Sequence, residues 1–190
     1  MLTADILGER ARLTPEKVAL VDVTTRRRYT YRELNERAVR CAQIWATQCS
    51  LKKGDRIGIL SENRVEFLDA FFAAGKSGVI LVPLSTRLTA RELETIARDS
   101  GLKCLFFSGN YAETVRSLRR SLAVEHWVTL DEPLDSSDLI YQECAAAASP
   151  ADWMPTRCQA EDVYCLLYTS GTTGRPKGVM IPHRMVIWNG

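Results

Sequence analysis

The chain has 190 residues, of which 46% are hydrophobic and 25% are charged, a composition typical of a soluble globular protein. Its 25 basic and 23 acidic residues nearly cancel, which argues against nucleic acid or an anionic membrane as the partner. The basic clusters at 26–28 and at Arg116, Arg119 and Arg120 are better explained as a turn and a solvated helix face.

The first part of the chain predicts a strand, a helix and a second strand. Residues 17–23 form an apolar run, which the basic turn follows. Thr30 and Glu33 form a capping box, in which each side chain accepts a hydrogen bond from a backbone N–H at the start of a helix. Residues 56–60 form the next strand. The apolar face of the intervening helix consists of Leu34, Ala38, Cys41, Ala42 and Trp45.

A helix and a continuously apolar strand come next. Ser61 is the candidate cap of this helix, and residues 78–84 are apolar almost throughout, as expected of a strand covered on both faces. A second capping box, Thr89 with Glu92, opens another helix. The apolar positions of the two helices are Val65, Leu68, Phe72 and Gly75 in the first, and Leu93, Ile96 and Ala97 in the second.

The alternation continues with strands at 103–108 and 126–130 and a helix near 112–122. Residues 131–161 are rich in Ser, Asp and Ala, and they predict a loose connection that holds one short helix, near 139–147. Residues 162–168 form a further strand. Repeated strand–helix order at this spacing predicts an α/β fold, a mostly parallel sheet with helices on both faces.

Targeting and metal-binding signals are weak in this sequence. Residues 1–17 carry several charges and no long apolar run, so a secretory signal is not expected. The apolar runs at 67–75 and 78–84 are too short to span a bilayer. Six cysteines without a C-x-x-C pair indicate reduced thiols, and with only two histidines no metal site is expected. These features predict a cytoplasmic protein without a transmembrane segment.

The segment "YTSGTTGRPKGV", residues 168–179, combines glycines, hydroxyls and a lysine. Gly171 and Gly174 allow the backbone to approach a ligand, and successive N–H groups in such a turn form an anion-binding concavity. Four hydroxyls and the charge of Lys177 add donors, and several charge-assisted hydrogen bonds of about 1.5–3 kcal/mol each can hold a polyphosphate. The alternative is a hairpin tip without a ligand.

Two common nucleotide-binding motifs do not fit this segment. In a Walker A motif the lysine would follow the second glycine, but Pro176 stands at that glycine and Gly178 follows Lys177. The G-x-G-x-x-G motif fails because Thr173 occupies the place of its second glycine. Both motifs lead into a helix, whereas the segment up to Pro182 leaves no room for one, so the loop is predicted to join two strands. His183 either begins the last helix or contacts the ligand.

The segment "YTSGTTGRPKGVMIPHR" resembles the phosphate-binding signature of the AMP-forming acyl-CoA synthetases, in the adenylate-forming enzyme superfamily. Residues 29–38 and 73–94 resemble the family's two earlier conserved blocks, in the same order. The resemblance covers nearly the whole chain. It implies that residues 1–190 are the N-terminal part of an AMP-binding domain, an incomplete part of the adenylate-forming enzyme fold.

The resemblance also implies a two-step reaction. A carboxylate attacks the α-phosphate of ATP, bound with Mg²⁺, to give an acyl-adenylate and pyrophosphate, and the thiol of coenzyme A then displaces AMP. The stretch 80–88 is closer to acyl- and aryl-CoA ligases than to peptide-synthetase adenylation domains, and a fatty acid is the expected substrate. The ATP-phosphate-binding residues carried over from the family are Thr169, Ser170, Gly171, Thr172, Thr173, Gly174 and Lys177.

The family's later elements have no counterpart in residues 1–190. These are the Tyr-Gly-x-Thr-Glu block, the aspartate that holds the ribose, and the C-terminal domain with its catalytic lysine. No catalytic residue is therefore expected in this fragment, and the chain alone is expected to be inactive. The first hypothesis is an N-terminal fragment of an acyl-CoA ligase; the alternatives are a stand-alone module that binds a nucleotide or a partner without catalysis, or part of an aryl-CoA ligase or peptide-synthetase domain.

Overall fold

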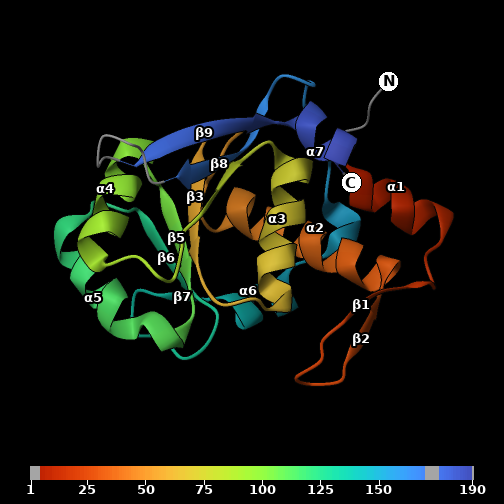
Figure 1. Cartoon of the computed structure of the whole chain (residues 1–190). Coiled ribbons are helices and arrows are strands. Elements are labelled where there is room, and N and C mark those ends of the chain that lie inside the picture. Colours follow the sequence, from red (N-terminus) through yellow and green to blue (C-terminus); the bar gives the residue numbers. More distant parts are fainter. Residues whose placement is uncertain (1–4, 170–175, 190) are drawn as a thin grey trace.

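A seven-stranded sheet lies between two layers of helices in the part of the chain that the structure describes (Figure 1). The computed structural model describes residues 5–169 and 176–189. The strands follow the order β7-β6-β5-β3-β4-β8-β9, and all neighbours are parallel except β8 and β9, which are antiparallel. The predicted α/β class is therefore confirmed. The strands are β3 (Arg56–Leu60), β4 (Ile80–Pro83), β5 (Cys104–Phe107), β6 (His126–Thr129), β7 (Leu139–Ile140), β8 (Val163–Thr169) and β9 (Lys177–Pro182).

The helices cover both faces of the sheet, as predicted (Figure 1). One face packs against α2 (Tyr31–Thr47), α3 (Val65–Ser77) and α6 (Tyr141–Ala147). The other face packs against α4 (Ala90–Ser100) and α5 (Ala112–Ser121). The remaining elements are α1 (Ile6–Leu13), a small antiparallel pair of β1 (Val18–Val21) and β2 (Arg28–Thr30), the short 3-10 helices Gly109–Tyr111 and Pro150–Asp152, and α7 (His183–Asn189).

Both predicted capping boxes are present. The Thr30 hydroxyl accepts a hydrogen bond from the N–H of Glu33 at 3.2 Å, and the N–H of Thr30 donates to the Glu33 carboxylate at 2.7 Å. Thr89 and Glu92 make the same reciprocal pair at the start of α4. The helices that they open bury the predicted apolar positions, because local capping and the 3.6-residue period point to the same structure.

The predicted cap of α3 was wrong, and its predicted buried face was only partly right, since Val65 and Gly75 are buried. The helix begins at Val65, and its N-cap residue Arg64 makes no side-chain cap hydrogen bond. Its buried residues include Asp69 and Lys76, whereas the predicted Leu68 and Phe72 are only partly buried. The charged side chains are tolerated there because α3 lies between the sheet and other helices, which supply their partners.

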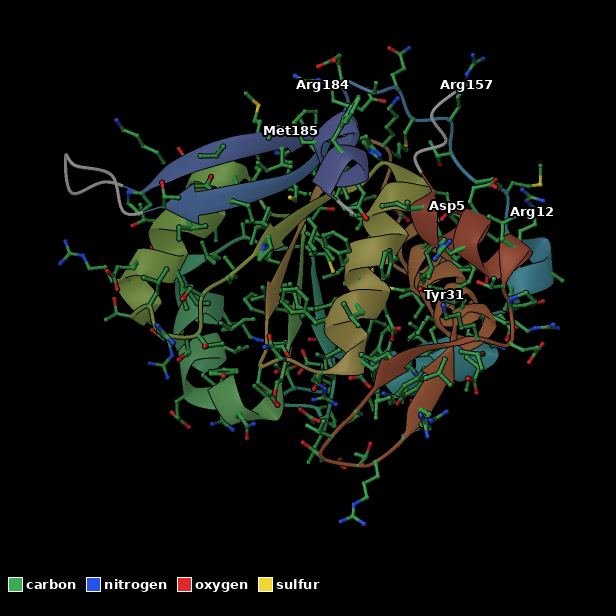
Figure 2. All side chains as sticks on the ribbon, turned by 45° about the vertical axis from the view of Figure 1, so that its right-hand side comes forward. Asp5, Arg12, Tyr31, Arg157, Arg184 and Met185 are labelled. Carbon is green, nitrogen blue, oxygen red and sulfur yellow. The ribbon has the colours of Figure 1, made fainter. Side chains whose placement is uncertain are left out.

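Lys76 illustrates how α3 satisfies a buried charge. Its side chain is 2% exposed, and its ammonium donates to both carboxylate oxygens of Asp5 at 2.8 and 2.7 Å and to the side-chain oxygen of Asn35 at 2.6 Å. Asp5 also caps α1 by accepting the N–H of Gly8 (Figure 2). Burial lowers the pKa of Lys76, and the carboxylate of Asp5 opposes that shift. The three contacts tie α1, α2 and α3 together.

The stretch 131–161 is more ordered than a loose connection. Leu139–Ile140 forms the edge strand β7, so the short helix begins at Tyr141 and not at 139. Tyr141 is buried in the core, and Trp153 packs against the same cluster. A two-residue strand is too short for a periodicity signal, and it forms because β6 offers a free edge.

Arg119 was also wrongly placed among solvated residues. Its guanidinium lies 4.6 Å from the ring centroid of Trp127 and pairs with the buried carboxylate of Asp138. Only 23% of its side chain is exposed. Arg116 on the same helix makes an exposed pair with Glu113, as a solvated face predicts. The difference arises because α5 turns Arg119 toward β6 and the 131–138 segment.

A buried charge cluster joins α2, α3 and α6. The guanidinium of Arg37 makes two hydrogen bonds to the carboxylate of Asp69, at 2.9 and 2.6 Å, and the hydroxyl of Tyr141 donates to the same carboxylate at 2.9 Å. The Asp69 side chain is 1% exposed. Burial raises the pKa of Asp69 to about 6, against the opposing effect of Arg37. The contribution of Asp69 to the stability of the fold is therefore fully present below pH 3.8, its ordinary pKa. It is lost as the pH rises through about 6, its pKa in the folded protein.

Replacing Arg37 should destabilise the fold in a pH-dependent way. We expect Arg37→Met to lower the free energy of unfolding by about 3–5 kcal/mol, because it leaves a buried carboxylate without its partner. The loss should be larger at pH 8 than at pH 5, since protonation relieves the unpaired charge. Urea denaturation of a dilute sample at both pH values measures it. Arg116→Met, which breaks an exposed pair, should cost less than about 1 kcal/mol and serves as the control; equal losses in the two variants would contradict the assignment.

Strand β9 and helix α7 expose several large apolar side chains. Val179 and Met180 on β9 are 46% and 66% exposed, and Trp188 on α7 is 80% exposed. Strand β9 lies at the edge of the sheet, where a row of backbone N–H and C=O groups faces outward. None of the described helices combines the length and the hydropathy that crossing a membrane would require. Val179 and Met180 are successive residues of a strand and point to opposite faces, so apolar side chains are exposed on both faces of β9 and also on α7.

The exposed apolar residues of β9 and α7 should make the 190-residue chain self-associate when it is produced alone. We expect light scattering to show an average mass that rises with concentration, because an exposed apolar edge strand is a template for pairing. Met180→Glu should suppress the effect by placing a charge on that strand. Met154→Glu changes a methionine that is 83% exposed but belongs to neither β9 nor α7, and it should have no effect. A monomer at all concentrations would disprove this expectation.

Candidate functional site

The glycine-rich segment connects two antiparallel strands. Strand β8 runs parallel to β4, and β9 returns along it, with Thr169 paired to Lys177 and Tyr168 paired to Gly178. Helix α7 begins only at His183, after β9 has ended. The predicted strand–loop–strand arrangement is therefore confirmed. Anion binding at this loop would come from backbone amides, hydroxyls and a lysine, because no helix N-terminus follows it directly.

The structure places two of the predicted phosphate-binding residues at the neck of the loop. Thr169 ends β8 and Lys177 begins β9, and both are exposed. Among the described residues, no carboxylate forms an ion pair with Lys177, so its ammonium faces solvent at the carboxyl end of the parallel strands. The other predicted ligands lie outside the described residues; they are Ser170, Gly171, Thr172, Thr173 and Gly174.

A contact to α4 holds the neck of this hairpin. The hydroxyl of Tyr168 donates to a carboxylate oxygen of Asp99 at 2.6 Å. Burial and the contact with Asp99 raise the pKa of Tyr168 to about 12, so the phenol stays protonated as a donor. The sequence does not predict this pair, because Asp99 is an ordinary polar residue of an amphipathic helix and lies far from Tyr168 along the chain.

A cavity of about 540 Å³ lies beside the neck of the hairpin. Its lining is mostly polar on the α4 side, and Pro176, next to Lys177, closes it on the loop side. Arg91 contributes a positive charge to this lining, whereas Glu92 and Asp99 contribute negative ones. The mixed charge makes the cavity a poor phosphate site by itself. The complete lining is Arg91, Glu92, Thr95, Ile96, Asp99, Tyr168 and Pro176.

His183 does not lie among groups suited to ligand binding. Its backbone N–H donates to the carbonyl of Asp162 at 3.0 Å, and its ring packs edge-on against Tyr164 with 4.9 Å between centroids. The residue is 1% exposed, and neither ring nitrogen has a hydrogen-bond partner among the described residues. Burial lowers the pKa of His183, which favours the neutral ring. Of the two roles that the sequence left open, the structure supports the start of the last helix.

An apolar groove of about 970 Å³ runs along the opposite side of the hairpin. Figure 2 labels two of its lining residues, Tyr31 at the start of α2 and Met185 on α7. Aromatic side chains of α3, including Phe67 and Phe71, form its floor together with Ile181 of β9. Such a surface suits an apolar partner and not a phosphate.

A known family and several characterised proteins match nearly the whole of this chain. The family described as AMP-binding enzyme matches residues 7–190. The long-chain-fatty-acid–CoA ligase FadD13 of Mycobacterium tuberculosis is 36% identical over 185 residues, which are 95% of this chain and 35% of that protein. Feruloyl-CoA synthase of Amycolatopsis sp is 36% identical over 180 residues, 95% of this chain and 33% of that protein. The chain thus spans about a third of the length of these relatives.

Solved structures show the same fold. The inhibitor-bound N-terminal domain of FACL13 from Mycobacterium tuberculosis matches 96% of this chain and 45% of that chain, with a TM-score of 0.84 and 34% identity. The anthranilate CoA ligase AuaEII, in complex with anthranoyl-AMP, matches 97% of this chain and 35% of that chain, with a TM-score of 0.88 and 26% identity. The chain therefore belongs to the AMP-binding enzyme family, and it corresponds to the N-terminal part of the family's CoA ligases.

Proposed function

We propose that this chain is the N-terminal part of an AMP-forming acyl-CoA ligase and that residues 169–177 bind the phosphates of ATP. The observation that carries the proposal is the hairpin itself. A glycine- and hydroxyl-rich loop joins β8 to β9, within a chain matched by the AMP-binding family over residues 7–190. Lys177, which forms no ion pair with a carboxylate of the described residues, stands at its neck. The loop can therefore surround an anion without a helix dipole.

The proposed reaction has two steps. In the first, a carboxylate oxygen of the acid attacks the α-phosphorus of ATP, the bond to the bridging oxygen breaks, and magnesium pyrophosphate leaves with the electron pair. In the second, the thiol sulfur of coenzyme A attacks the acyl carbon of the adenylate, AMP leaves, and the thiol proton passes to solvent or a base. Magnesium enters with ATP as part of the substrate complex.

The residues of this chain would act in the first step. Negative charge gathers on the β- and γ-phosphates as pyrophosphate leaves, and donors that are already oriented stabilise that charge without reorganisation. Lys177 supplies a full positive charge at one side of the loop neck, and the hydroxyl of Thr169 lies directly across the strand pair. The remaining proposed donors are the hydroxyls and amides of 170–174.

The proposed substrate is a carboxylic acid with an apolar body. Relatives of equal identity include a long-chain-fatty-acid–CoA ligase and a feruloyl-CoA synthase, so aliphatic and aromatic acids both belong in an activity screen. We favour a fatty acid, because the sequence around residues 80–88 resembles acyl-CoA ligases. ATP and coenzyme A as substrates, together with free cysteines at all six positions, favour a cytoplasmic enzyme.

Lys177→Ala separates the two steps in the full-length protein. We expect it to slow ATP–pyrophosphate exchange by about 100-fold or more, in the range found for removing one oriented donor. Thioester formation from a supplied acyl-adenylate should change little, because pyrophosphate has already left. The control is Lys52→Ala. It removes the same charge from the segment just before β3, at the amino ends of the parallel strands and away from the loop.

The same assay distinguishes the alternatives. Equal losses in both half-reactions would contradict the assignment of Lys177 to the pyrophosphate. A wild-type protein that binds ATP but activates no fatty, aromatic or amino acid would instead support a binding module without catalysis. An acid panel that ranks feruloyl or benzoyl acids above fatty acids would assign the protein to the aryl-CoA ligases.

A further inference from the structure

The loop end of the β8–β9 hairpin lies beyond the backbone pairing that joins the hairpin to the rest of the sheet. Strand β9 pairs with β8 alone, and the ladder between β4 and β8 contains one paired position, Leu81 with Cys165. Tyr168 lies three residues beyond Cys165, a distance of roughly 10 Å along an extended strand. Thr169 and Lys177 are therefore carried on a two-stranded arm that extends past its last backbone pairing with the sheet.

Tyr168 provides a polar contact between this arm and the rest of the domain. Its hydroxyl donates to Asp99 on α4 at 2.6 Å, and its partly buried ring packs against the cluster on the α4 side of the sheet. Tyr168 is adjacent in sequence to Thr169 and pairs across the strands with Gly178, which is adjacent to Lys177. The side chain of Tyr168 therefore belongs to the strand pair next to the one formed by Thr169 and Lys177.

Gly178 makes room for the tyrosine ring. It is absent from the glycines with positive φ, so its backbone does not demand glycine. A Cβ at this position would lie 3.0 Å from Cζ, 3.2 Å from Oη and 3.3 Å from Cε1 of Tyr168. These distances are shorter than ordinary contacts, so a Cβ at this position would require the ring of Tyr168 to shift by a few tenths of an ångström. Space, and not conformation, therefore explains the glycine that follows Lys177.

We propose that Tyr168 is a positioning residue that acts with Asp99 and Gly178 to hold the neck of the phosphate loop against α4. The inference rests on the proposed function, because the phosphates are what Thr169 and Lys177 would be positioned for. A tether of this kind fixes where the ammonium of Lys177 stands relative to the domain. Its loss leaves the chemistry of the donors unchanged but lets the arm that carries them move.

The test compares two tyrosines that each donate a hydrogen bond to an aspartate. Tyr168→Phe keeps the ring over Gly178 and removes only the hydroxyl. Tyr141→Phe removes the hydroxyl that donates to Asp69 at 2.9 Å in the core, far from the loop. In the full-length protein we expect Tyr168→Phe to lower kcat/KM for ATP in pyrophosphate exchange by about 10-fold, the equivalent of one hydrogen bond to a charged group. Thioester formation from supplied adenylate should stay within about 2-fold, as the mechanism of the first step requires.

The controls separate positioning from general stability. Tyr141→Phe should lower the thermal midpoint without a selective loss in the ATP step. Asp99→Ala should reproduce the loss seen in Tyr168→Phe, and the double variant should be no worse than either single one, because both changes break the same bond. If Tyr168→Phe and Tyr141→Phe lowered both half-reactions in proportion to stability, Tyr168 would be merely structural and the proposal would fail.

A size exchange tests the role of Gly178 independently. Gly178→Ala should impair the ATP step more than Tyr168→Phe does, and adding Tyr168→Leu should restore part of the activity, since leucine has no atoms at the Cζ and Oη positions. Additive losses would overturn this part. The activity of the wild-type protein decides the proposed function separately: if it shows no exchange with any acid, that function fails, and the weakening of MgATP binding by Tyr168→Phe, measured by calorimetry, then decides the positioning role. A wild-type protein that neither exchanges nor binds MgATP overturns both.

Discussion

Strand β3 lies at the centre of the sheet, and its burial on every side constrains the rest of the fold. It is hydrogen-bonded to β4 along one edge and to β5 along the other. Ile57 and Ile59 point into the cluster on the α2–α3 side, whereas Leu60 points into the cluster on the α4–α5 side. A Cβ on Gly58 would lie only 2.7 Å from side-chain carbons of Leu102 and Leu105, so even an alanine has little room there. The chain must add strands outward from this one in both directions, and the glycine loop is reached at one edge.

Because the loop-bearing hairpin is at that edge, it needs support from side chains. In the middle of the sheet, backbone hydrogen bonds hold each strand on two sides. The backbone pairing of β8 with β4 is brief, and the proposed role of the Tyr168–Asp99 contact is to add support there. An edge position also suits the proposed function, since a loop that surrounds a polyphosphate needs open space around it.

The helical layer on the α2–α3 side of the sheet contains buried charged side chains. Helix α3 is enclosed between the sheet and α2, yet it carries Glu66, Asp69 and Lys76 on buried positions. Asp69 pairs with Arg37 of α2, and Lys76 pairs with Asp5, the N-cap residue of α1. Glu66 pairs with Arg64, the N-cap residue of the same helix, and accepts a hydrogen bond from the side chain of Gln142 of α6. Buried pairs of this kind add little net stability but penalise any arrangement that separates the partners. They therefore fix how α1, α2 and α6 pack around α3.

The amino-acid sequence by itself determined the local elements and the family. Both capping boxes, the strands at 56–60 and 126–129, and the change of direction after residue 169 follow from neighbouring residues, because caps, periods and turn residues act over a few positions. The two-residue strand β7, the burial of Asp69 and Lys76, and the pairing of Tyr168 with Asp99 were decided only by the tertiary structure. In each of these the partner lies far away along the chain, and a residue pattern contains no information on which distant group will satisfy a buried charge, a free strand edge or a hydroxyl. Gly178 is an example, because only the tertiary structure shows that the ring of Tyr168 lies close to where its side chain would begin.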